Sequence, residues 1–152
     1  MATVHTFEVY PTVEELNEAL GRAFLARLNT LIDEAGADSR INLAISGGAI
    51  TTTLLPSLLP SADKIDWSRV RVWLVDERYV PAGNEDRNDD QAWEGFLHAA
   101  TGVEFVRMPS SDESAPGAGS LDEATAAFAD TWRKIMGERS FDIALIGMGP
   151  DG

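Results

Sequence analysis

Three short apolar runs, each ending in a polar or glycine-rich loop, constrain the fold of this chain more than any other feature. They occupy residues 41–45, 70–75 and 141–146, and stretches with the apolar spacing of helices separate them. Runs of this length are typical of buried strands in a parallel sheet, whose usual connections are helices of ten or more residues. The pattern therefore predicts an α/β fold, with an open, mainly parallel, Rossmann-like sheet and helices on both of its faces.

Caps and apolar spacing predict the remaining elements. Thr12 with Glu15, and Ser120 with Glu123, have the spacing of capping boxes and predict two long helices that begin there. Further helices are expected through residues 49–59 and from about residue 89, and short strands over residues 4–10 and 104–106. With 152 residues, 44% of them hydrophobic, the chain is long enough for one core, so residues 1–152 are expected to form part of a single domain.

The last apolar run leads into a glycine-rich turn, residues 147–152, where the sequence ends. A parallel strand of this kind needs a crossover helix to return the chain to the sheet. We therefore expect a fold that is incomplete at its C-terminus, and a chain that represents the N-terminal part of a larger domain.

The balance of charge and the residue types narrow the range of functions. Twenty-five acidic and 12 basic side chains give a net charge of −13, which argues against non-specific nucleic-acid binding. The chain has no cysteine and only two histidines, which lie far apart in the sequence, so neither a disulfide nor a metal site is expected. It has no signal-peptide pattern and no apolar run of about 18 residues, which predicts no membrane span and a cytoplasmic location.

The loops that follow the three runs contain the candidate site residues. The carboxyl ends of parallel strands meet at one edge of a sheet, so these loops are expected to converge although they lie far apart in the sequence. In Ser46-Gly47-Gly48, the glycines allow backbone N–H groups to approach an anion at the start of a helix. The alternative is a plain tight connection. The loop lacks the spaced glycines of ATP and dinucleotide sites, so no such cofactor is expected.

The second loop, Asp76-Glu77-Arg78, places three charges directly after a strand. The planar guanidinium of Arg78 suits a phosphate or carboxylate. The alternative is a structural ion pair with Asp76 or with an acid across the crevice. Arg87, further along the same polar segment, is expected either to reach the same ligand or to lie in a solvated turn.

The third loop is the terminal turn. Its glycines, Gly149 among them, bend the backbone tightly, and Asp151 is the acid best placed to face a ligand there. The alternative is an ordinary Asp-Gly turn without a chemical role.

Taken together, these segments resemble the 6-phosphogluconolactonase family. The residues that carry the resemblance are Ser46-Gly47-Gly48, Ile65-Asp66-Trp67, Asp76-Glu77-Arg78-Tyr79-Val80-Pro81, Arg87-Asn88 and Gly147-Met148-Gly149-Pro150-Asp151-Gly152, in that order. The resemblance implies the fold shared with glucosamine-6-phosphate deaminases, ribose-5-phosphate isomerases and CoA transferases. It also implies hydrolysis of 6-phosphogluconolactone, a phosphorylated sugar lactone, to 6-phosphogluconate in the pentose phosphate pathway, without a metal or cofactor.

The resemblance also implies roles for individual residues. The backbone at Gly47 and Gly48 would receive the sugar phosphate together with Arg78, while Asp76 and Asp151 would line the crevice. The family's proposed general base is a histidine immediately after the Asp-Gly turn, beyond the end of this sequence. We therefore expect the 152-residue chain to be inactive alone, and a C-terminal half, supplied as a separate polypeptide, to be its partner.

The chain departs from the family pattern at one segment, and we also consider two alternative functions. Many family members carry Ser-Thr-Pro or a further glycine where this chain has Ala49-Ile50-Thr51, which leaves phosphate binding more dependent on backbone N–H groups. A sugar-phosphate isomerase or deaminase of the same fold is the first alternative, although deaminases resemble Asp-Glu-Tyr where this chain has Arg78. A non-catalytic module that binds sugar phosphates is the second.

Overall fold

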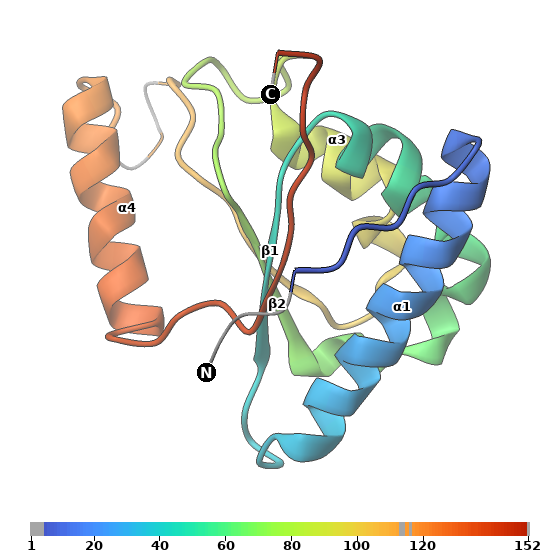
Figure 1. Cartoon of the computed structure of the whole chain (residues 1–152). Coiled ribbons are helices and arrows are strands. Elements are labelled where there is room, and N and C mark those ends of the chain that lie inside the picture. The colour runs from blue at the N-terminus through green and yellow to red at the C-terminus, as the bar shows by residue number, and fades with distance from the viewer. Residues whose placement is uncertain (1–4, 113–114, 116, 152) are drawn as a thin grey trace.

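Four parallel strands form one sheet in this computed structural model, which describes residues 5–112, 115 and 117–151 (Figure 1). The strand order is β3-β2-β1-β4. The strands are β1 (Ile41–Ile45), β2 (Val70–Leu74), β3 (Glu104–Val106) and β4 (Ile143–Leu145). The predicted parallel α/β fold is confirmed, and β1 and β2, which lie in the centre of the sheet, are also its most deeply buried strands.

Helices cover both faces of the sheet, as predicted (Figure 1). One face carries α1 (Val13–Glu34), α2 (Leu55–Ser57) and α3 (Asn88–Gly95), and the other carries α4 (Leu121–Ile135). The hydroxyl groups of Thr12 and Ser120 accept the N–H groups of Glu15 and Glu123, each at 3.2 Å, so both predicted helix starts are confirmed. Among the residues described, no helix is both long and apolar enough to cross a membrane.

The helix expected through residues 49–59 is irregular. It begins as a π-helical turn, Ile50–Leu54, in which the N–H of Leu55 donates to the carbonyl of Ile50, and it continues as α2. Pro56 has no N–H group, so the regular hydrogen-bond ladder is interrupted at this point. Short 3₁₀ turns, Leu59–Lys64, Trp67–Arg69 and Leu97–Ala99, complete the connections.

The core has two parts, one on each face of the sheet. Under α1 and α3, apolar side chains from the helices meet those of the strands, with Leu28, Val70 and Val72 completely buried. Under α4, the rings of Trp73, Phe128, Trp132 and Phe141 form an aromatic cluster with centroids 5.0–6.4 Å apart. These two layers hold the central strands rigidly, which fixes the position of the loops at their carboxyl ends.

The strand expected over residues 4–10 is wrong for its described part, residues 5–10, while Val4 lies outside the described residues. Residues 5–10 join none of the four strands, and the side chains of Phe7 and Val9 are more than 90% exposed. Alternation of side chains specifies a strand only where a neighbouring strand and a buried face stabilise it, and this segment has neither.

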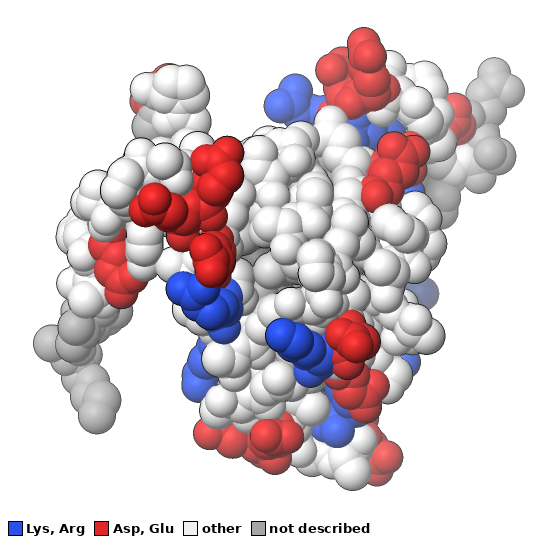
Figure 2. All heavy atoms as spheres, turned by 90° about the vertical axis from the view of Figure 1, so that its right-hand side faces the viewer, with Lys and Arg blue, Asp and Glu red and all other residues white. Residues whose placement is uncertain are grey.

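Acidic side chains spread over the face that α1 covers, with basic side chains interspersed (Figure 2). The exposed acids of this helix are Glu14, Glu15, Glu18, Asp33 and Glu34. A surface of this sign repels anions, so an anionic ligand needs a local site with its own positive charge or N–H donors.

Candidate functional site

An open crevice of about 470 Å³ lies at the carboxyl edge of the sheet. Residues 46–49 follow β1, Asp76 and Arg78 follow β2, and residues 147–150 follow β4; Asn88, the first residue of α3, completes the wall. Because β2, β1 and β4 are neighbours in the sheet, their loops meet. The structure therefore brings the three loops together, as the sequence predicts.

Two glycines shape the loop after β1. Gly48 has a φ of +63°, which favours glycine, and its carbonyl accepts the N–H and the hydroxyl of Thr52 at 3.0 and 2.9 Å. A Cβ atom at Gly47 would overlap the side-chain amide of Asn88. The loop therefore presents bare backbone to the crevice, and any side chain at residue 47 would push Asn88 away.

Ser46 ties two of the loops together. Its backbone N–H donates to the carbonyl of Leu145 at 3.0 Å, and its hydroxyl accepts the N–H of Gly147 at 2.8 Å. Ser46 thus lines the crevice and also fixes the loop after β4 against the loop after β1.

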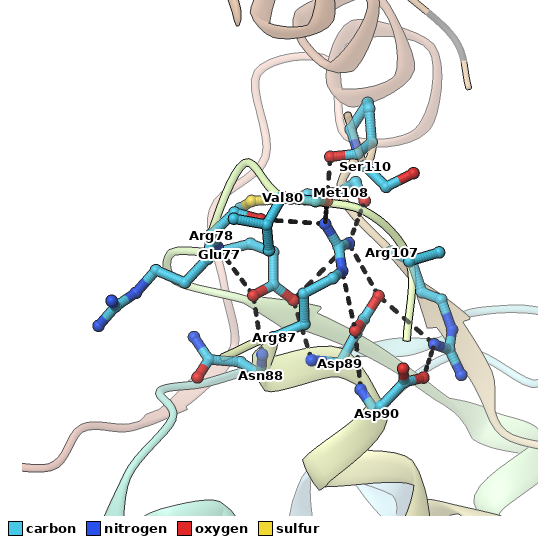
Figure 3. A network of polar contacts seen from close by, with 12 residues as sticks. Glu77, Arg78, Val80, Arg87, Asn88, Asp89, Asp90, Arg107, Met108 and Ser110 are labelled. Carbon is cyan, nitrogen blue, oxygen red and sulfur yellow. Dashed lines mark hydrogen bonds and ion pairs between the residues drawn. The ribbon is translucent and has the colours of Figure 1, made fainter. Parts of the chain in front are cut away.

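Arg78 is the one cationic side chain among the described residues that line the crevice. Both Arg78 and Asp76 are exposed, and among the described residues no acid lies within 4.0 Å of the Arg78 guanidinium. The side chain extends away from the polar network behind it (Figure 3). The geometry thus contradicts the alternative in which Arg78 forms a structural ion pair with Asp76.

Glu77, between these two residues, supports the wall of the crevice, a contact that sequence reasoning missed. Its carboxylate accepts the backbone N–H groups of Arg78, Asn88 and Asp89 at 2.8, 2.8 and 2.9 Å, and only 2% of the side chain is exposed. It therefore caps the first turn of α3, whose own N-cap residue, Arg87, provides no side-chain cap. An acid at a strand end, followed by a helix with no cap of its own, is the signal that could have revealed it.

Arg87 lies outside the crevice, with its side chain 2% exposed. Its Nε and Nη2 donate to the Asp89 carboxylate at 3.2 and 2.9 Å (Figure 3). Its remaining N–H groups donate to main-chain carbonyls, those of Arg78 (3.0 Å), Met108 (2.8 Å), Val80 (3.5 Å) and Pro109 (3.5 Å). The structure thus places Arg87 neither beside a ligand nor in a solvated turn, but in a buried clamp that joins residues 78–80 to residues 108–109.

The charges of this network shift the pKa values of both partners. Burial alone would raise the pKa of Asp89, but the hydrogen bonds and charge of Arg87, with help from the N–H of Asp90 and the charge of Arg107, hold it below its ordinary value. Burial alone would lower the pKa of Arg87, but the hydrogen bonds and charge of Asp89 raise it. Asp89 is therefore ionised at neutral pH.

The terminal turn forms the third wall. Gly149 lines the crevice, whereas Asp151 is exposed and lies just beyond it. A Cβ atom at Gly149 would lie 2.7 Å from Oδ1 of Asp151, so this carboxylate sits directly against the lining residue. In the part of the chain that the structure describes, no cluster of three or more His, Asp or Glu side chains is arranged to hold a metal ion.

Comparisons with known proteins agree with this geometry. A family described as "Glucosamine-6-phosphate isomerases/6-phosphogluconolactonase" matches residues 11–152. The 6-phosphogluconolactonase of Rhizobium meliloti is 36% identical over 152 residues, which cover 99% of this chain and 59% of that protein. The enzyme of the same name from Streptomyces coelicolor is 32% identical over 146 residues, 88% of this chain and 55% of that protein.

Solved structures show the same relationship. The crystal structure of a 6-phosphogluconolactonase from Shewanella baltica matches 94% of this chain and 56% of that chain, with a TM-score of 0.74 and 27% identity. The chain thus spans somewhat more than half the length of the relatives that it matches. Since the family match extends over nearly all of its residues, the chain belongs to the glucosamine-6-phosphate isomerase and 6-phosphogluconolactonase family.

Proposed function

We propose that this chain carries the sugar-phosphate site of a cytoplasmic 6-phosphogluconolactonase, which hydrolyses 6-phosphogluconolactone to 6-phosphogluconate in the pentose phosphate pathway. The observation that carries the proposal is the position of Arg78, which faces the crevice without an acidic partner among the described residues, in a wall shared with the bare backbone of Gly47 and Gly48. The identity to lactonases from Rhizobium meliloti and Streptomyces coelicolor supports this substrate.

In this proposal, the phosphate binds to Arg78 and to the backbone N–H groups of residues 47–49. A guanidinium and convergent N–H groups are the usual protein donors to a phosphate. Ser46 keeps two of the walls in place because it ties their loops together, and Gly149 contributes backbone to the third wall. Arg87 contributes indirectly, because its clamp holds the carbonyl of Arg78.

The remote phosphate orients the lactone carbonyl for attack by water. Hydrolysis of a lactone needs no covalent nucleophile, but it needs a general base for the water and donors for the developing oxyanion. We assign supporting roles to Asp76 and Asp151, which lie on the crevice wall and beside Gly149. In this proposal the base itself is a histidine immediately after the Asp-Gly turn, as the family resemblance implies. Binding energy at the phosphate then accelerates a reaction at the other end of the sugar.

A lactone-hydrolysis assay tests the proposal. It compares the 152-residue chain, the same chain extended with the C-terminal part of the Rhizobium meliloti lactonase, and the two parts mixed as separate polypeptides. We expect turnover in the extended form and none in the 152-residue chain alone. Turnover in the mixture would support a separate C-terminal partner. If none of the three hydrolyses the lactone while the extended form is folded, the assignment is wrong.

A further inference from the structure

We propose that Glu77 is a positioning residue for the phosphate site: its buried carboxylate holds Arg78 and Asn88 where they face the glycine loop. The inference rests on the proposed function only where it names phosphate as the ligand. The positioning itself follows from contacts of the described residues.

The two carboxylate oxygens of Glu77 accept different backbone N–H groups. Oε1 of Glu77 accepts the N–H groups of Arg78 and Asn88, each at 2.8 Å, and Oε2 accepts that of Asp89 at 2.9 Å (Figure 3). One side chain thus fixes the backbone where it leaves β2 and where it enters α3. The two wall segments of the crevice cannot move apart without breaking hydrogen bonds to a buried charge, which are among the stronger ones in proteins.

Asn88 extends this control to the glycine loop. The side-chain amide of Asn88 donates to the carbonyl of Asp76 at 3.1 Å, and its oxygen fills the space that a side chain at Gly47 would occupy. The position of Asn88 therefore sets how closely the loop after β2 approaches the glycine loop after β1. Glu77 acts on that distance through a single intervening residue.

The contacts of Glu77 differ from those of Asp89, the residue that balances the buried positive charge. The buried cation of the network, Arg87, pairs mainly with Asp89, at 2.9 Å, whereas its nearest approach to Glu77 is 3.8 Å. The close partners of Glu77 are three main-chain N–H groups, and two of them belong to residues that line the crevice. Glu77 is therefore arranged to place backbone beside the site, while Asp89 balances the buried charge.

The test compares Glu77→Gln with a matched control, Asp142→Asn. The carboxylate of Asp142 also accepts a backbone N–H, that of Asn42 at 2.7 Å, but at the opposite end of the strands. Both substitutions replace a carboxylate by an amide that keeps one acceptor oxygen. In Glu77→Gln the other oxygen becomes an NH₂ group, which faces a backbone N–H and cannot accept it. Two measurements are made on the 152-residue chain: hydrogen exchange of the Arg78, Asn88 and Asp89 amides, and calorimetric affinity for 6-phosphogluconate and for gluconate.

We expect exchange of the Asp89 amide, which then faces the NH₂ group, to accelerate about tenfold or more in Glu77→Gln, and exchange of the Arg78 and Asn88 amides, which keep only a neutral acceptor, to accelerate as well. All three should stay unchanged in Asp142→Asn. Affinity for 6-phosphogluconate should fall about tenfold, with no comparable change for gluconate. Unchanged amide exchange, or an equal loss of affinity for both ligands, would overturn the inference. If Glu77→Gln does not fold, Glu77→Asp, which keeps the charge but shortens the side chain, should give the same pattern. If the unsubstituted chain binds neither ligand, the proposed function fails, and amide exchange still decides the role of Glu77.

Discussion

At the scale of single residues, the proposed phosphate site depends most on Arg78. The chain has a net charge of −13, so most of its surface opposes an anionic ligand. Arg78 is exposed, has no acid within ion-pair distance among the described residues, and is the cation of the crevice wall that they form. A guanidinium in this state loses no existing ion pair when a phosphate binds.

The substitution Arg78→Ala should therefore weaken binding of 6-phosphogluconate about 10- to 100-fold, because it removes charge-assisted hydrogen bonds. Isothermal titration calorimetry measures the effect. Arg22→Ala is the control, since Arg22 pairs with Glu18 on the exposed surface of α1. An equal loss of affinity for unphosphorylated gluconate would show that Arg78 does not recognise the phosphate.

The residue type at Gly47 is dictated by its close contact with the side chain of Asn88. In Gly47→Ala the new methyl group would overlap the Asn88 side chain, so the chain should lose about 1–3 kcal/mol of unfolding free energy and bind 6-phosphogluconate more weakly. Thermal unfolding and calorimetry measure these changes. In the control, Gly36→Ala, the added atom would meet Ser39 at an ordinary contact distance of 3.5 Å. Equal behaviour of the two variants would contradict the close packing of Asn88 on the glycine loop.

At the scale of elements, the start of α3 depends on charges that come from other segments. Glu77 caps it from the end of β2, and the pair of Arg87 with Asp89 joins it to the backbone around Met108. These contacts hold the polar segment between β2 and α3 although it has little regular structure of its own. The rigidity of this wall of the crevice therefore depends on these contacts.

The pKa shift of Asp89 gives the network a pH dependence. The folded-state pKa is lowered, so the stabilisation is fully present above the unfolded pKa of about 4 and is lost as the pH falls through the folded value. Asp89→Asn should cost about 3 kcal/mol of unfolding free energy at neutral pH, because it leaves Arg87 buried without its main partner. It should also flatten the decline of stability below pH 4. Urea unfolding at a series of pH values tests this, and an unchanged acid slope would mean that Asp89 does not carry the effect.

The elements also show what local sequence information can and cannot predict. The strands and the starts of α1 and α4 were predictable, because apolar periodicity and capping residues act over a few positions. Residues 5–10 were predicted wrongly because pairing depends on a neighbouring strand, which local alternation does not reveal. The buried position of Arg87 was not predictable for a similar reason, because its acceptors include the carbonyl of Met108, 21 residues further along the chain.

At the scale of the whole molecule, the topology of the sheet determines where the site lies. Strands β2, β1 and β4 are neighbours, so the loops that follow them meet although they come from residues about 30 to 100 positions apart. The convergence was predictable from the general rule for parallel sheets. The hydrogen bonds by which Glu77 supports the crevice wall were not predictable. They depend on how the segment between β2 and α3 folds back on itself.

The central claim is that these three loops form one sugar-phosphate pocket. Titration of the ¹⁵N-labelled chain with 6-phosphogluconate, followed by NMR, tests it most directly. We expect the amide signals of Gly47, Gly48, Arg78 and Gly149 to shift together with a single dissociation constant. Those of the opposite sheet end, such as Asn42 and Asp142, should stay in place. Saturable shifts confined to another face, or no shift at any of the four crevice amides, would contradict it.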